Sequence, residues 1–285
     1  MTPRARAHAC LVGAAFIFGT TFVTVKSAIG HAQPIPFLGA RFLVGALVVA
    51  PFAARRPATK GETRGAGSAG LALLSGYVFQ TIGLRYTSSS VSAFVTYLLV
   101  IFVPLLHALR TRRLPRLAVV VGVGVAFFGL GVLTGAGGVG LGRGELLTVA
   151  AAFGFALHIL ALEAIAGRSD PLRINVIQLS VVAGACLGPG FFLGGYRFPL
   201  MTWLAVLYTG VAASAVAFFL QIWGQTHDDA TRASLVLLME PVFAALLGAW
   251  AGDRLGWRGG AGAALILIGI FVTELSSVAD RLRAG

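Results

Sequence analysis

The second half of this chain repeats the first, and the repeat limits the possible folds more than any single motif does. Both halves contain an alanine-rich start, a proline-led segment, a Gln-x-x-Gly and a late glycine pair. The aligned positions include Ala14 with Ala151, Pro34 with Pro171, Arg41 with Gln178, Gln80 with Gln221, Gly83 with Gly224, and Gly129 with Gly269. The fold must therefore consist of two similar units that together cover nearly the whole chain.

The composition indicates that these units are surrounded by lipid. Hydrophobic residues make up 57% of the 285 residues, charged residues 11%, and the mean hydropathy is +0.88. Soluble domains carry about 25% charged residues, and each apolar run here is close to the roughly 20 residues that cross a hydrocarbon layer as a helix. The expected spans are 8–28, 35–53, 67–84, 89–109, 116–134, 144–166, 172–194, 200–221, 231–251 and 258–277. These runs do not alternate apolar and polar residues, which disfavours a β-barrel.

Each copy of the repeat thus holds an odd number of spans, so the two copies must lie in opposite orientations in the membrane. We predict an all-α integral membrane protein whose ten transmembrane helices form two inverted five-helix repeats around a central cavity. The first repeat is expected at 1–134, a Gly-rich linker at 135–143, and the inverted second repeat at 144–285. The three parts should form one structural unit.

The net charge of +12 would suggest nucleic-acid binding in a soluble protein, but the location of the charges argues against it here. With the N-terminus placed in the cytoplasm, most Lys and Arg residues fall in the inner loops and tails. Only Arg85, Arg143, Arg197, Arg254 and Arg258 fall in the outer loops. This positive-inside bias predicts a multi-pass protein of a bacterial inner membrane with both termini in the cytoplasm.

The sequence gives no indication of a metal site, a cofactor or a disulfide framework. Cys10 and Cys186 both lie within apolar spans, and no metal-ligand spacing is present. The glycine cluster at 135–144 lacks a closing Gly-Lys-Ser/Thr, so we interpret it as a flexible connection and not as a phosphate-binding loop. An embedded enzyme would need clustered polar groups, whereas the polar residues within these spans are solitary. No enzymatic activity is predicted.

Several segments are similar to those of a known family. In the last third of the chain they are Ala230–Ser234 (ATRAS), Met239–Leu247 (MEPVFAALL) and Gly252–Leu255 (GDRL). In the first half, Tyr86–Ser90 (YTSSS) and Phe102–Leu106 (FVPLL) correspond to the same unit. These segments resemble the closing spans of EamA-type proteins in the drug/metabolite transporter superfamily. Asp253 stands where the family usually has glutamate, which keeps the charge.

The resemblance implies a carrier of small metabolites, with a central cavity formed by spans one to four and six to nine and with spans five and ten outside. Members of the family include amino-acid and drug exporters, and distant relatives carry nucleotide sugars or phosphorylated sugars. On this basis the amino-acid exporter branch is the expected relative. The lipid bilayer and a small-molecule substrate are the implied partners, with protons as a further candidate, and the protein is expected to be a monomer or a weak homodimer.

The deepest ionisable residue is Glu240, near the middle of span nine. An ionisable group at membrane depth is costly unless it faces a cavity or a partner, so each such residue is a candidate site. Pro241 follows it, and the missing N–H of the proline frees a carbonyl on the preceding turn and can bend the helix. Two roles stay open for Glu240: a carboxyl that binds a proton or a substrate amine, or a hydrogen-bonded group that shapes the helix break.

Three further ionisable residues are candidates. His158, past the middle of span six, could donate to a substrate carboxylate, relay a proton, or serve only as a packed and hydrogen-bonded histidine. Lys26 and Arg41 lie near the outer ends of spans one and two and could together hold an anionic group. Snorkelling of Lys26 to the outer head groups explains that lysine almost as well, which leaves Arg41 as the better candidate for a cavity role.

Other expected cavity residues are polar or aromatic, because a cavity lined by aromatic rings with a few polar groups suits amino acids or flat hydrophobic cations. They are Gln80, Gln221, Tyr77, Tyr97, Phe94 and Phe22. Positions expected to break helices or let them slide are Pro241, Pro104, Gly19, Gly83 and Gly224.

These patterns and the family resemblance together predict a secondary transporter that exports small metabolites by alternating access, with amino acids or related amphipathic compounds as the leading substrate class. Organic cations or drugs and phosphorylated or nucleotide sugars are the alternative substrates. The last group would normally require more cavity cations than Lys26 and Arg41 supply. A channel is disfavoured.

Overall fold

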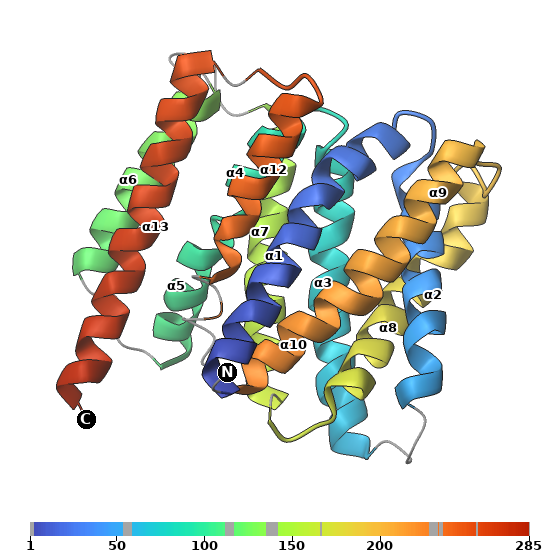
Figure 1. Ribbon diagram of the computed structural model, residues 1–285, viewed down its shortest axis with the longest axis horizontal. Helices are drawn as coiled ribbons and strands as arrows, with labels where there is room; N and C mark the ends of the chain where they lie inside the picture. The colour runs from blue at the N-terminus through green and yellow to red at the C-terminus, as the bar shows by residue number, and fades with distance from the viewer. Residues whose placement is uncertain are drawn as a thin grey trace.

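In the computed structural model the chain is a helical bundle, described for residues 3–53, 59–111, 117–134, 142–165, 167–227, 233, 236–254 and 256–284 (Figure 1). No strand occurs within these ranges. In chain order the helices are α1 (Pro3–Ala28), α2 (Pro34–Ala53), α3 (Lys60–Gly83), α4 (Ser89–Thr96), α5 (Leu99–Thr111), α6 (Leu117–Thr134), α7 (Arg143–Ile165), α8 (Pro171–Phe192), α9 (Leu200–Tyr208), the π-helical segment η1 (Thr209–Ala217), α10 (Phe218–His227), α12 (Met239–Trp250) and α13 (Gly256–Ala284).

These helices confirm the all-α, ten-span fold. Helices α4 and α5 together form the fourth span, broken at Tyr97 and Leu98, and α9, η1 and α10 form one continuous eighth span. Among the described residues, five helical segments are long and apolar enough to cross a membrane, and three shorter apolar helices accompany them. The long segments are Arg6–Ala28, Pro34–Ala53, Arg143–Ile165, Pro171–Phe192 and Leu200–His227.

The helices pair in the way that a two-fold relation between inverted halves requires. Helix α2 packs along α8, its counterpart in the other half, and α6 packs along α13 at one edge of the bundle (Figure 1). The contact of α3 with α7 is mirrored by the contact of α1 with η1 and α10. Likewise, α1 packs on α12 as α7 packs on α4 and α5. Spans five and ten are therefore set to one side, and the remaining spans enclose the centre.

The start of α3 differs from the sequence expectation. The third span was expected to begin at residue 67, but α3 begins at Lys60 because Thr59 and Glu62 form a capping box. The Thr59 hydroxyl accepts from Glu62 N at 3.2 Å, and Thr59 N donates to Glu62 Oε2 at 2.9 Å. Two otherwise unpaired groups at the helix start are thereby satisfied, which adds about two turns to the span.

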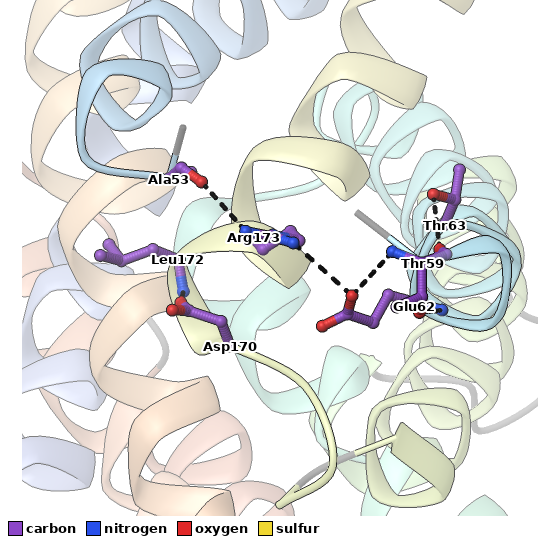
Figure 2. A network of polar contacts seen from close by, with 7 residues as sticks. All are labelled: Ala53, Thr59, Glu62, Thr63, Asp170, Leu172 and Arg173. Carbon is purple, nitrogen blue, oxygen red and sulfur yellow. Dashed lines mark hydrogen bonds and ion pairs between the residues drawn. The ribbon is translucent and has the colours of Figure 1, made fainter. Parts of the chain in front are cut away.

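The same glutamate joins three helix ends, as Figure 2 shows. Arg173, near the start of α8, lies 3.6 Å from Glu62 Oε2, and its Nη2 approaches Ala53 O at the end of α2 at 3.5 Å. Both charged side chains are buried. Asp170 caps α8 by accepting from Leu172 N at 2.8 Å. The first half is thus tied to the second at this end of the bundle.

Candidate functional site

A cavity lies at the centre of the bundle, between the two halves. It contains about 610 Å³ of empty space, part of it open to solvent. The lining side chains come from six of the spans and are mostly aromatic or polar: Phe18, Thr21 and Phe22 from α1, Tyr77 and Gln80 from α3, Thr96, Tyr97 and Leu99 from the broken fourth span, Phe155, His158 and Ile159 from α7, Phe218 and Gln221 from α10, and Leu237 and Glu240 from the ninth span.

Glu240 is the acidic residue among these lining side chains, and its position follows from the proline beside it. Pro241 has no N–H to offer to Leu237 O on the preceding turn, so this carbonyl needs another donor. The Tyr97 hydroxyl, from the opposite half, contacts Leu237 O, and it also lies 2.9 Å from Glu240 Oε2. Tyr97 therefore occupies the break in the fourth span and supports the break in the ninth.

One hydroxyl proton cannot serve two acceptors at once. When Tyr97 donates to the Glu240 carboxylate, Leu237 O is left without that proton. When Tyr97 donates to Leu237 O, its oxygen can accept a hydrogen bond from Glu240 only if the glutamate is protonated. An ionised Glu240 then needs another donor. The Tyr97 hydroxyl thus connects Glu240 to the hydrogen bonding of the helix break.

The aromatic walls of the cavity follow the two-fold relation of the halves. The register that aligns Ala14 with Ala151 pairs Phe18 with Phe155, and the register that aligns Gln80 with Gln221 pairs Tyr77 with Phe218. The ring centroids of Phe18 and Phe218 are 5.0 Å apart, and those of Tyr77 and Phe155 are 5.2 Å apart, both edge to face. Equivalent rings therefore face the cavity from both halves.

Polar groups on these walls are only partly symmetric. Gln80 and Gln221 both line the cavity, and Gln80 Nε2 donates to Thr96 Oγ1 at 3.0 Å. His158 lines it too, and its Nε2 lies 2.9 Å from Gln178 Oε1. His158 is thus both a cavity residue and a hydrogen-bonded one, which leaves both of its expected roles open.

Arg41 lies behind the cavity wall. It is 1% exposed, and its Nε donates to Ser214 Oγ at 3.1 Å while Nη2 approaches the Tyr77 hydroxyl at 3.4 Å. Its guanidinium lies 4.8 Å from the centroid of the Tyr77 ring, which does line the cavity. The arginine expected in the cavity is thus not a lining residue, and it contacts the lining residue Tyr77.

Lys26 lies at the end of the bundle where α3 ends and α4 begins. Its Nζ donates to Leu84 O at 2.6 Å and to Thr87 O at 2.8 Å. Nearby, Asp253 accepts from both the backbone and the hydroxyl of Ser90 at 3.0 Å, at the start of α4. Lys26 and Arg41 therefore do not meet in one site, and Lys26 is a helix-end donor here.

The expected hinge residues are mostly places of close packing. A methyl group added at Gly19 would lie 2.8 Å from Phe243 Cβ and 3.0 Å from Glu240 O. Gly83 has similarly close neighbours in α7, and Gly224 packs on Leu11 of α1. Pro104 lies within α5, but its side chain is outside the described part of the structure.

Several lining residues were not predicted from the sequence. Phe18 was not among the expected cavity residues, yet it lines the cavity beside Phe22. Phe94, which was expected to line the cavity, is buried in the core cluster. Phe155 and Phe218 could have been found by carrying the repeat register from the first half to the second. The π-helical segment η1, which presents Ser214 to Arg41, has no signal in its run of small residues.

The fold is that of a polytopic helical membrane protein with a cavity between its two halves. Among the described residues no group of His, Cys, Asp and Glu is arranged to hold a metal ion. The chain belongs to the EamA-like transporter family, whose sequence profile matches residues 5–135 and again residues 142–275. It is therefore a membrane transporter, and this family implies a small-molecule substrate.

Individual relatives carry the same description. An "Uncharacterized transporter" of Archaeoglobus fulgidus is 30% identical over 235 residues, covering 81% of this chain and 73% of the relative. The "Uncharacterized transporter YoaV" of Bacillus subtilis is 23% identical over 250 residues, which cover 84% of this chain and 86% of the relative. A solved structure titled "Crystal structure of protein" matches with a TM-score of 0.69 at 23% identity, covering 96% of this chain and 98% of that one, which shows the fold alone.

Proposed function

We propose that this transporter is a secondary carrier that exports small amphipathic metabolites, with amino acids as the leading class, by exposing the central cavity to either side in turn. The observation that supports this most is the cavity itself, which both halves line and in which Glu240 is the acidic group. Inverted halves can rock about a site at their interface, which is the usual basis of alternating access.

Glu240 is proposed as the group that binds a substrate amine or a proton during the cycle. A carboxylate enclosed by hydrophobic walls is costly unless a cation or a proton neutralises it. Among the described residues its hydrogen-bond partner is the Tyr97 hydroxyl. Binding a cation or a proton at Glu240 frees Tyr97 to donate fully to Leu237 O, and this change at the helix break is the proposed link to movement of the ninth span.

The remaining lining favours an amphipathic substrate. Phe18, Phe155 and Phe218 present ring edges and faces, and Gln80 and Gln221 offer neutral donors and acceptors on both sides. Such walls accept an apolar side chain and hydrogen-bond its polar end. A phosphorylated substrate would need several cations in the cavity, and the lining residues that the structure describes include neither lysine nor arginine.

An organic cation is the second candidate, because a carboxylate beside aromatic rings is also the pattern that binds substituted ammonium groups.

The membrane is proposed to be a bacterial inner membrane, with both ends of the chain on the cytoplasmic side. Transport is proposed to proceed without an enzymatic step. A proton gradient is the proposed source of energy.

The test is counterflow in liposomes. Purified protein is reconstituted, liposomes are loaded with unlabelled compound, and entry of the labelled compound is followed for phenylalanine, leucine, tetraphenylphosphonium and glucose 6-phosphate. Saturable counterflow of the amino acids supports the proposal, and counterflow of tetraphenylphosphonium alone selects the second candidate. Flux of glucose 6-phosphate, or flux that does not saturate, refutes it.

A further inference from the structure

A buried cation stands behind the cavity wall without a carboxylate to neutralise it. Arg41 donates to Ser214 and Tyr77 and lies over the rings of Phe42 and Tyr77 at 5.3 and 4.8 Å. All of these partners are neutral, and no acidic side chain of the described chain pairs with it. A charge buried at membrane depth without a counterion is unfavourable, and such residues usually mark a site for an ion or a ligand.

Tyr77 is the group through which that charge reaches the cavity. The Arg41 guanidinium approaches the Tyr77 oxygen as a donor, so the hydroxyl proton of Tyr77 points elsewhere. In the described part of the chain, no residue accepts that proton. Tyr77 is 6% exposed and lines the cavity, so a molecule bound there is the acceptor that this proton lacks in our proposal.

The second half shows what this position looks like without the arginine. The repeat registers place Phe218 at the counterpart of Tyr77 and Gln178 at the counterpart of Arg41. Phe218 has no hydroxyl, and Gln178 is neutral and hydrogen-bonded to His158 and Asn175. A donor backed by a cation therefore exists on one side of the cavity only.

We propose that Tyr77, backed by Arg41, is an anion subsite that binds the carboxylate of a zwitterionic substrate while Glu240 binds its amine. Tyr77 belongs to α3 and Glu240 to α12, and both line the same cavity. A zwitterion that places its amine at Glu240 and its carboxylate at Tyr77 neutralises both buried charges at once. An organic cation neutralises Glu240 and leaves Arg41 uncompensated.

This inference rests on the proposed function for the movement of substrate, but the subsite can be tested by binding as well. Phenylalanine and phenylalaninamide are compared at mildly acidic pH, where both amines are protonated, so that the ratio of their affinities reports the contribution of the carboxylate. The wild type is expected to prefer the acid in detergent-phase thermal stabilisation and in counterflow. Tyr77→Phe keeps the ring and removes the donor, and it should lower the preference by about tenfold or more, the usual effect of losing a hydrogen bond to a charged group.

Two further variants separate a binding role from a structural one. Arg41→Gln should lower the preference for the acid with little change in the affinity for the amide, and Arg41→Lys, which keeps the charge, should retain part of that preference. The double variant Tyr77→Phe, Phe218→Tyr moves the hydroxyl to the side that lacks the arginine. It should not restore the preference for the acid.

The outcomes distinguish failure of the subsite from failure of the proposed function. If Tyr77→Phe leaves the ratio of the affinities for acid and amide unchanged, the subsite is overturned. Counterflow by the wild type still supports the proposed carrier in that case. Stabilisation by the acid that depends on Tyr77, with no counterflow of either compound, supports the subsite and overturns the proposed transport. Restoration of the preference by the double variant shows that Arg41 is not needed and also overturns the proposal.

Discussion

Removing the Tyr97 hydroxyl tests the link between the cavity and the helix break. Tyr97→Phe leaves Leu237 O, which Pro241 cannot serve, without its donor, and it removes the partner of Glu240. A buried acceptor left unsatisfied costs about 1–3 kcal/mol. At about 2–4 °C per kcal/mol for a large domain, the midpoint of thermal unfolding in detergent should fall by several degrees.

The structure supplies a specific rescue. Pro241→Ala restores an N–H at the position that normally bonds to Leu237 O. In the Tyr97→Phe background this change should recover most of the lost stability. Transport should stay reduced, because Glu240 still lacks its hydroxyl partner. Tyr86→Phe is the matched control, since Tyr86 is 52% exposed and no described residue hydrogen-bonds its hydroxyl.

The measurement is thermal unfolding followed by tryptophan fluorescence, together with amino-acid counterflow in liposomes. If Tyr97→Phe unfolds at the wild-type temperature, the hydroxyl does not support the helix break. If Pro241→Ala restores transport as fully as stability, the hydroxyl acts only through Leu237, and its proposed role at Glu240 is refuted.

Two other predictions concern packing and charge. Gly19→Val should destabilise the protein by roughly 1–3 kcal/mol, because a methyl group there would lie 2.8 Å from Phe243 Cβ. Gly184→Val is the control, since nothing lies within 4 Å of a methyl group at that position. Equal unfolding midpoints of the two variants would refute the close approach of α1 and α12. Arg173→Met should destabilise more than the double variant Arg173→Met, Glu62→Gln, because the single change leaves a buried carboxylate facing an apolar side chain. Unfolding midpoints in detergent decide this, and a double variant less stable than the single one would contradict it.

The span pattern could be predicted because the membrane imposes it. Runs near the length of a bilayer helix located every span, and the repeat indicated how the halves are related. The start of α3 was missed although its signal was present, since Thr59 and Glu62 have the spacing of a capping box. The break at Tyr97 and Leu98 had no such signal, because neither proline nor glycine occurs there.

The candidate residues could be selected from the sequence as rare ionisable groups in apolar runs, but the direction in which their side chains turn could not be predicted. Glu240 was identified as a solitary acid in mid-span, and it lies in the cavity. Arg41 and Lys26 were similarly rare cations, yet one is turned behind Tyr77 and the other caps a helix end. Which way such a side chain turns depends on neighbouring helices, and a single sequence does not fix their rotation. The π-helical turn that brings Ser214 to Arg41 shows the same limit.

The most direct test of the account is substrate flux driven by a proton gradient in Glu240→Gln. Liposomes containing the wild type should accumulate labelled phenylalanine against its gradient when a pH difference is imposed, and collapse of that difference should abolish accumulation. Glu240→Gln keeps the shape of the side chain but cannot exchange a proton, so its transport should lose the response to pH. A thermal unfolding midpoint near that of the wild type should show that the variant is folded. Accumulation by this variant with the pH dependence of the wild type would contradict the central role assigned to Glu240.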